Sequence, residues 1–253
     1  MASYLVTGSS RGLGLALISR LASLPAADVG KIIATARQDN SPQLKEIVDA
    51  SSGRVEIVKL DVTNKLSVQE AANLVEGKLH GKGLDYLVNN AGLMDRSPDG
   101  LAGMDNLDDI FHTNVTSVHN VTQAFLPLLR KGKKKIVINI STTLGSFAKA
   151  EIYRQSPTPA YKITKAALNM LTVQYAQQYE PDGFTFLAVT PGWLRTDLGS
   201  SRADLPVETG AEKVVDILQQ TGPHQNGKFV NIHVPGWENP LGNNQYDGQE
   251  VGW

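Results

Sequence analysis

The chain has 253 residues, 24 basic against 25 acidic side chains for a formal net charge of -1, and no cysteine. This length suits one large α/β domain, so we expect a single domain over residues 1–253. The charge balance argues against a nucleic-acid partner, and the lack of cysteine excludes disulfide scaffolds, zinc-thiolate sites and cysteine nucleophiles.

The N-terminus passes directly into a strand-like run, Tyr4-Leu5-Val6, without the charged and apolar regions of a signal peptide. No apolar stretch approaches the roughly 18 residues that a membrane span requires. We therefore expect a cytoplasmic protein with no membrane partner.

Strand-like and helix-like runs alternate along the chain. The strands are expected where short β-branched runs are bounded by turn residues: Tyr4–Thr7, Lys31–Ala36, Arg54–Leu60, Asp85–Asn89, Lys135–Ile140, Phe184–Thr190 and Lys228–Ile232. The helices are expected where apolar residues recur at three and four: Leu13–Leu24, Pro42–Ala50, Ser67–Leu79, Asp105–Arg130, Pro159–Tyr179 and Val207–Gln220.

Strands that are joined by crossover helices pair in parallel, with right-handed connections. We therefore predict a three-layer, doubly wound α/β fold of the Rossmann type, with a mostly parallel seven-stranded sheet and helices on both faces. Ligands of such sheets bind beyond the carboxyl ends of the strands, where the strand order reverses.

A glycine-rich turn, Thr7-Gly8-Ser9-Ser10-Arg11-Gly12-Leu13-Gly14, follows the first strand. Gly8 permits a tight turn, Gly12 leaves room for a pyrophosphate near the backbone, and Gly14 lets the next helix pack closely on the sheet. The N–H groups at the start of that helix would face the phosphates. Such turns also occur without a ligand, and the position after the first strand is what favours a dinucleotide.

The end of the second strand indicates which dinucleotide is bound. NAD enzymes usually place an acidic residue there to bind the ribose 2′-hydroxyl, but this chain has Ala36 followed by Arg37. Arg37 and Arg11 could together bind a 2′-phosphate, so we expect NADP(H) as the cofactor. The alternative is that both arginines are ordinary surface residues.

Tyr161 and Lys165 are spaced by one helical turn. A phenol has a pKa near 10 and is a reluctant acid unless a neighbouring cation favours the phenolate, which Lys165 could do. The lysine could also bind the ribose of a nicotinamide, while Tyr161 donates a proton to a developing alkoxide. Alone, this spacing is more often a solvated helix face.

Several motifs resemble, in order, those of the short-chain dehydrogenase/reductase superfamily: Thr7-Gly8-x-x-x-Gly12-x-Gly14, Asp61-Val62, Asn89-Asn90-Ala91-Gly92, Asn114, Tyr161-x-x-x-Lys165 and Pro191-Gly192. The ending, from Gly227-Lys228-Phe229 through Tyr246-Asp247-Gly248 to Trp253, resembles the small carbonyl reductases that include the C-factor and sniffer-like proteins.

The resemblance implies a catalytic set of Asn114, Thr142, Tyr161 and Lys165, with Asn114 holding a water beside Lys165. It also implies, with the motifs above, a cofactor-binding set and no metal ligand. That set comprises Gly8, Ser10, Arg11, Gly12, Leu13, Gly14, Arg37, Asp61, Val62, Asn90, Ala91, Gly92, Tyr161, Lys165, Pro191, Gly192, Leu194 and Thr196.

One position departs from the superfamily pattern, which usually has a serine three residues before the glycine that follows the fifth strand. Counting back from Gly145 gives Thr142. Threonine has the same hydroxyl with a stiffer side chain, so we expect activity with a narrower pocket. Ser141 is the alternative if the loop is shifted by one residue, and both hydroxyls could instead satisfy the strand end.

The substrate region is expected to contain apolar and aromatic side chains from the loops: Leu93, Met94, Phe147, Ile152, Trp193 and Leu198. Residues 146–159 and 197–206 are interpreted as lids over the site. The reaction expected is NADPH-dependent reduction of a ketone or aldehyde, with a small carbonyl or alcohol compound as the partner. A non-redox NADP(H)-sensing regulator or scaffold, and an isomerase or cyclase, stay open as alternatives. The resemblance further implies a homodimer or homotetramer.

Overall fold

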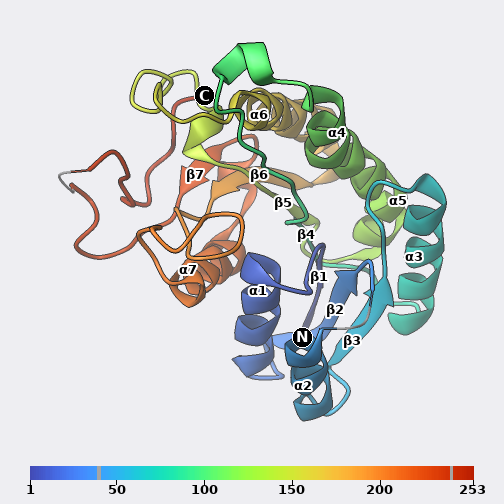
Figure 1. Cartoon of the computed structure of the whole chain (residues 1–253). Helices are drawn as coiled ribbons and strands as arrows, with labels where there is room; N and C mark the ends of the chain where they lie inside the picture. The colour runs from blue at the N-terminus through green and yellow to red at the C-terminus, as the bar shows by residue number, and fades with distance from the viewer. Residues whose placement is uncertain (39–40, 240–241) are drawn as a thin grey trace.

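The computed structural model describes residues 1–38, 41–239 and 242–253. Within these ranges, seven strands form one sheet in the order β3-β2-β1-β4-β5-β6-β7, and all neighbouring strands are parallel (Figure 1). The strands are β1 (Ala2–Val6), β2 (Val29–Ala36), β3 (Val55–Lys59), β4 (Tyr86–Asn89), β5 (Ile136–Ile140), β6 (Thr185–Thr190) and β7 (Phe229–Asn231). The predicted doubly wound α/β fold is confirmed, and the strand order reverses between β1 and β4.

Helices cover both faces of the sheet (Figure 1). One face packs against α1 (Gly12–Ser23), α2 (Pro42–Ala50) and α7 (Val207–Gln220). The other packs against α3 (Lys65–Lys78), α5 (Ser117–Lys131) and α6 (Pro159–Tyr179). The short helix α4 (Leu107–Phe111) precedes α5.

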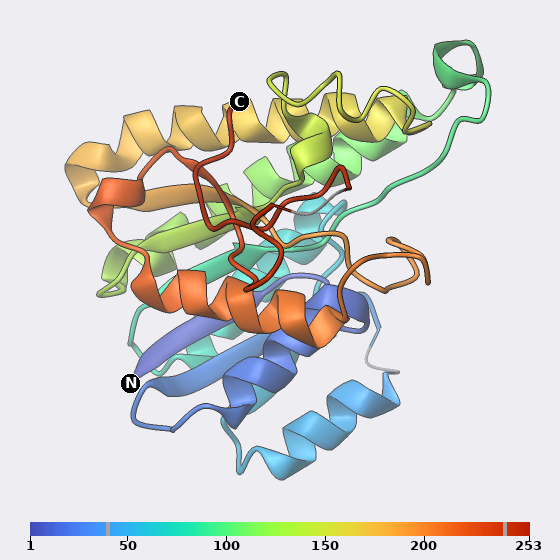
Figure 2. The same cartoon turned by 90° about the vertical axis from the view of Figure 1, so that its left-hand side faces the viewer.

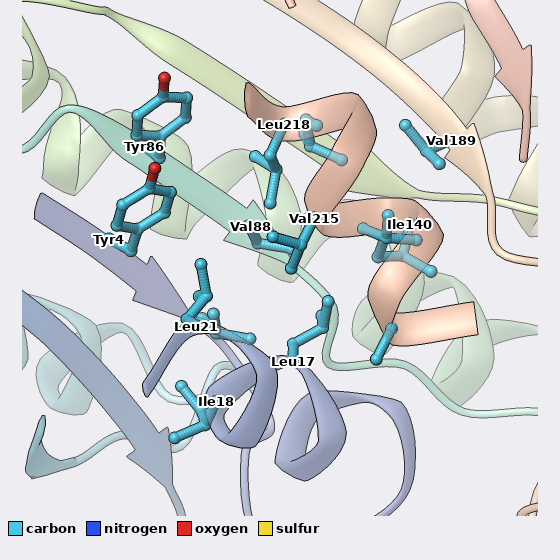
Figure 3. Packing of buried hydrophobic residues seen from close by; sticks show 14 of the residues in the cluster. Tyr4, Leu17, Ile18, Leu21, Tyr86, Val88, Ile140, Val189, Val215 and Leu218 are labelled. Atoms are coloured by element: carbon cyan, nitrogen blue, oxygen red, sulfur yellow. The ribbon is translucent and has the colours of Figure 1, made fainter. Parts of the chain in front are cut away.

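The first core is formed where α1 and α7 meet over the middle of the sheet. Figure 3 shows Leu17 and Leu21 of α1 and Val215 of α7, all fully buried, close to Val88 of β4. Each of these apolar residues lies on the face of its element that is turned away from water. Burial of each large apolar side chain stabilises the fold by roughly 1.5–3 kcal/mol. The two helices thereby fix the glycine turn that begins α1 against the sheet.

The helix predicted over Asp105–Arg130 is not regular. It consists of α4, a π-helical turn at His112–Thr116 and α5, and Pro127 lies within α5. The apolar spacing predicted one continuous helix, whereas the structure has a π-helical turn between two α-helical segments. The other five helices were predicted to within two residues at each end.

The loops that follow the strands gather at one edge of the sheet. Figure 2 shows the green loop after β4 and the orange loop before α7 projecting on the side of the molecule opposite the N-terminus. The described helices include none that is both long enough and apolar enough to cross a membrane. The carboxyl edge is where the topology predicts a ligand.

Candidate functional site

A cavity of about 1040 Å³ lies at the carboxyl edge of the sheet. It is bounded by the glycine turn, the loops after β2 to β6, the start of α6 and the segment after β7. All the residues predicted for catalysis or cofactor binding line it, except Asn114. Residues more than 180 positions apart in the sequence therefore contribute to one site.

The glycine turn has the backbone that its sequence predicts. Gly8 and Gly12 have φ angles of 70° and 54°, a region that side-chain-bearing residues rarely adopt. A Cβ atom on Gly14 would lie 2.1 Å from the carbonyl oxygen of Gly8 and 2.6 Å from Nδ2 of Asn90. Only glycine at position 14 lets α1 begin this close to β1.

The first turn of α1 is open toward the cavity. No side chain among the described residues caps it, although Arg11 occupies the N-cap position. Its N–H groups and the positive end of the helix dipole are thus available to an anion. Because the backbone here lines the cavity without side chains at positions 8, 12 and 14, the turn fits a pyrophosphate.

The two arginines of the predicted 2′-phosphate site both line the cavity. Arg37 is exposed just beyond β2, and Ala36 before it is buried. Arg11 Nη1 lies 3.2 Å from Oδ2 of Asp197, in the loop after β6. This exposed ion pair joins the glycine turn to the opposite rim of the cavity.

Asp61 follows β3 and caps its own turn. Its Oδ1 accepts hydrogen bonds from the backbone N–H and the hydroxyl of Thr63, at 3.0 and 2.7 Å. These bonds, with the nearby charge of Arg37, lower the pKa of Asp61. The carboxylate is thereby fixed and ionised on the cavity wall next to Val62.

The loop after β4 is fastened to β1. Thr7 Oγ1 accepts from the backbone N–H groups of Asn90 and Ala91, at 2.9 and 3.0 Å. Asn90 Nδ2 in turn donates to the backbone oxygen of Thr7 at 2.8 Å. The two strands at the switch point therefore present their loops to the cavity in a fixed geometry.

Tyr161 and Lys165 lie in the first two turns of α6 and both side chains are buried, with 8% and 4% exposure. Lys165 Nζ lies 5.6 Å from the centre of the Tyr161 ring and donates to the carbonyl of Ile140 at 2.7 Å. Burial raises the pKa of the Tyr161 phenol and lowers the pKa of Lys165 to about 8.

The direction of the Tyr161 shift corrects the sequence-based expectation, which had the lysine charge favouring the phenolate. Desolvation causes both shifts, because a group that is removed from water shifts toward its neutral form. The phenol is a protonated, buried donor at neutral pH.

Asn114 lies in the π-helical turn, behind the cavity wall. Its Oδ1 accepts from the backbone N–H of Leu93, and its Nδ2 donates to the carbonyl of Leu93, both at 2.8 Å. Nδ2 also donates to Thr164 Oγ1 at 3.1 Å. The side chain thus ties the loop after β4 to α6, and the predicted water beside Lys165 stays a prediction.

Thr142 and Ser141 differ in burial and in their hydrogen-bond partners. Ser141 is buried, and its hydroxyl donates to Oδ1 of Asn169 at 2.6 Å. Thr142 is half-buried, and its Oγ1 accepts from the backbone N–H of Leu144 at 3.3 Å, which leaves its own proton for another acceptor. This geometry favours Thr142 as the hydroxyl that reaches a substrate.

The substrate part of the cavity differs from the expectation. Leu93, Met94, Trp193 and Leu198 line it, but Phe147 and Ile152 do not. Both predicted lids contribute further residues: Tyr153, Ser156, Pro157 and Thr158 from the first, and Asp197, Gly199 and Asp204 from the second.

Sequence reasoning also missed the segment after β7, which provides Trp237, Gly242, Asn243, Asn244, Gln245 and Tyr246. The signal was present, because a chain that leaves the carboxyl end of a strand leaves at the ligand-binding edge. Its mixture of aromatic and amide residues next to the last strand is typical of a pocket wall.

Comparisons with known proteins agree with this geometry. The family model described as short chain dehydrogenase matches residues 3–205. The chain is 34% identical over 236 residues to the short-chain dehydrogenase/reductase AacuF of Aspergillus aculeatus, covering 88% of this chain and 85% of that protein.

Two solved structures are similar over the whole chain. The NADPH-bound carbonyl reductase from chicken fatty liver has a TM-score of 0.86 at 29% identity, with 100% of this chain and 99% of that chain covered. The carbonyl reductase Sniffer of D. melanogaster has a TM-score of 0.87 at 29% identity, with both chains covered in full.

Proposed function

Because the chain belongs to the short-chain dehydrogenase/reductase family, we propose that it is an NADPH-dependent carbonyl reductase in which Tyr161 is the proton donor. The observation that carries the proposal is the joint position of the glycine turn, Tyr161 and Lys165 on one cavity. The NADPH of the similar carbonyl reductase from chicken fatty liver supports NADP(H) as the cofactor, and the cavity residues support the proposed roles toward a substrate.

The residues that would hold the dinucleotide form a continuous wall. The open first turn of α1 would bind the pyrophosphate, and Arg37 the 2′-phosphate; Asp61 and Val62 would flank the adenine. Pro191, Gly192, Leu194 and Thr196 would line the nicotinamide. When bound, the nicotinamide supplies the hydride that reduces the carbonyl carbon.

Tyr161 would supply the proton. The phenol is protonated at neutral pH, and an alkoxide is a much stronger base than a phenolate, so Tyr161 can donate to the oxygen that becomes the alkoxide. The hydroxyl of Thr142 would donate to the same oxygen and hold the carbonyl in place. Lys165, one helical turn from Tyr161, would bind the nicotinamide ribose when its amine is charged, and its pKa near 8 allows that at neutral pH.

The test is NADPH oxidation with a panel of ketones, quinones and aldehydes by the wild type and by Tyr161→Phe. We expect kcat to fall by roughly 100-fold or more, because the variant loses the general acid but keeps the ring. NADPH affinity, measured by fluorescence titration, should change by less than about threefold, because most proposed cofactor contacts are intact.

Tyr175→Phe is the matched control, since Tyr175 is on the same helix but its hydroxyl contacts Gln123 and His119 outside the cavity. It should reduce carbonyls at nearly the wild-type rate. A Tyr161→Phe variant as active as the wild type would exclude the phenol as the acid, and a wild type that binds NADPH but reduces no carbonyl would contradict the reductase itself.

A further inference from the structure

Asp204 places a carboxylate on the wall of the cavity. It is half-buried in the loop between β6 and α7. Its Oδ2 accepts two hydrogen bonds, from the Tyr246 hydroxyl at 2.5 Å and from Asn244 Nδ2 at 2.6 Å. Both donors come from the segment after β7, so the carboxylate is fixed by residues from two distant parts of the chain.

Hydrogen bonds place Asp204 at the catalytic end of the cavity. Asn244 Oδ1 accepts from the Tyr153 hydroxyl at 3.1 Å, and the Tyr153 oxygen accepts from Thr143 Oγ1 at 3.0 Å. Thr143 is next to Thr142, the proposed substrate contact. On the other side, Tyr246 accepts from the backbone N–H of Trp193 at 3.1 Å, just beyond the nicotinamide-lining Pro191-Gly192.

One oxygen of this carboxylate is left for a ligand. Among the described residues, none donates a hydrogen bond to Oδ1 of Asp204, and no cationic group lies within ion-pair distance of it. The neighbouring Arg195 is exposed and donates to the backbone oxygen of Asp204, not to its carboxylate.

The remaining charged groups of the cavity do not neutralise Asp204 by contact. Arg11 is paired with Asp197, and Arg37 lies beside Asp61. Arg96 is exposed on the loop after β4, and Lys165 donates to the backbone at the base of the site. The catalytic end therefore presents an acceptor with a negative charge.

We propose that Asp204 determines substrate specificity by selecting carbonyl compounds that carry a hydrogen-bond donor, a hydroxyl or an ammonium group, away from the reacting carbonyl. The inference rests on the proposed reductase function and names the substrate class of the same site. A donor on the substrate would form a hydrogen bond to Oδ1 of Asp204, whereas a substrate carboxylate would place a second negative charge beside it.

The shape of this end of the cavity indicates suitable probes. Tyr153, Trp193, Trp237 and Tyr246 line it. The rings of Trp237 and Tyr246 are 5.4 Å apart, and Trp193 is held by a hydrogen bond from Nε1 to the carbonyl of Gly199 at 2.6 Å. These fixed aromatic walls suit a flat ring, so ring-substituted acetophenones test the substituent preference.

The experiment compares meta- and para-substituted acetophenones with hydroxyl, aminomethyl, methoxy and carboxylate groups. Binding to the NADP⁺-saturated protein is measured by calorimetry, and turnover by NADPH oxidation. For the wild type we expect the hydroxyl and aminomethyl probes to bind about tenfold more tightly than the methoxy probe, and the carboxylate most weakly. In Asp204→Asn the aminomethyl preference should disappear, the hydroxyl preference should fall to within about threefold, and the carboxylate should gain about tenfold. A preference for the aminomethyl probe alone would identify the ligand group as a cation.

Two further variants distinguish a direct contact with Asp204 from an effect of net charge or of cavity shape. Asp197→Asn removes the same charge from another position of the same loop, where the carboxylate pairs with Arg11, and should leave the substituent preference unchanged. Tyr246→Phe removes the hydroxyl that donates to Asp204 and accepts from Trp193 but keeps the carboxylate, so it should keep most of the preference for donors. The proposal is overturned if Asp204→Asn keeps the wild-type preference, if Asp197→Asn shifts it equally, or if Tyr246→Phe reproduces Asp204→Asn. Turnover of unsubstituted acetophenone tests the reductase function separately, because the binding preferences do not depend on it.

Discussion

The absence of a side chain at Gly14 determines whether the glycine turn can form its side of the cavity. The start of α1 is so close to β1 that a Cβ atom on residue 14 would overlap the carbonyl oxygen of Gly8, a backbone atom that no rotamer change can move. Gly77, within α3, is exposed and has nothing within 4 Å of the corresponding position. The same methyl group should therefore have opposite effects at the two sites.

We expect Gly14→Ala to destabilise the protein by about 2–4 kcal/mol, because α1 must shift away from the turn. Gly77→Ala should stabilise it by about 0.5–1 kcal/mol, because alanine loses less backbone freedom in a helix. Urea denaturation monitored by circular dichroism measures both. Equal effects at the two positions would show that the overlap at Gly14 is relieved without cost.

The residues of the glycine turn could be predicted because their roles depend on local backbone geometry and spacing. The state of Tyr161 could not, because its raised pKa results from burial by elements far away in the sequence. Which of Thr142 and Ser141 offers its hydroxyl to a substrate could not be predicted either. It depends on Asn169, on a facing helix, which accepts the hydrogen bond of the Ser141 hydroxyl.

At the level of elements, a row of buried polar side chains joins the middle of the sheet to the helices on one face. Asn89 of β4 donates from Nδ2 to Asn139 Oδ1 of β5 at 2.9 Å and to Thr122 Oγ1 of α5 at 3.1 Å. Asn139 Nδ2 donates to Thr172 Oγ1 of α6 at 2.8 Å. Because these amides are buried, their bonds fix how α5 and α6 sit on the sheet, and α6 carries Tyr161.

A double-mutant cycle with Asn89→Val and Asn139→Val tests this coupling. Each single substitution should destabilise the protein by about 2 kcal/mol, since it removes two buried hydrogen bonds and leaves the facing amide group without one of its partners. The double variant should be more stable than the sum of the two losses predicts, by about 1 kcal/mol. Chemical denaturation gives the four free energies of unfolding, and strict additivity would show that the two amides act independently.

The elements themselves were largely predictable, because alternation and three-to-four spacing reflect which face of each strand or helix is buried. The π-helical turn at His112–Thr116 was not predicted, since apolar spacing at three and four does not reveal a π-helical turn within a longer helix. The role of Asn114 in holding Leu93 was not predicted either, because it depends on the loop after β4 lying against this turn.

At the level of the whole molecule, we propose that the cofactor and the substrate meet different charged side chains of one cavity. Arg11 and Arg37 come from the β1–β3 half, and Asp204 from the loop after β6, with the segment after β7 holding it. The net charge of the chain is only -1, so the positions of these charges are a local arrangement that composition does not predict. It divides recognition between the proposed phosphate of the cofactor and the proposed donor group of the substrate.

If Arg37 and Asp204 act independently, Arg37→Ala should change only the cofactor preference and Asp204→Asn only the substrate preference. We expect Arg37→Ala to lower kcat/KM for NADPH by roughly 10- to 100-fold, because a charge-assisted contact with the 2′-phosphate is lost, while kcat/KM for NADH changes by less than about threefold. The preference among substituted acetophenones should stay as in the wild type. In the double variant the logarithms of the two effects should add, as they do for distant sites that share no partner.

Arg130→Ala, which removes the same charge outside the cavity, controls for net charge. Steady-state kinetics with both cofactors measures all of these ratios, and a drop in NADH activity equal to that in NADPH would mean that Arg37 supports the fold of the cavity without binding the phosphate.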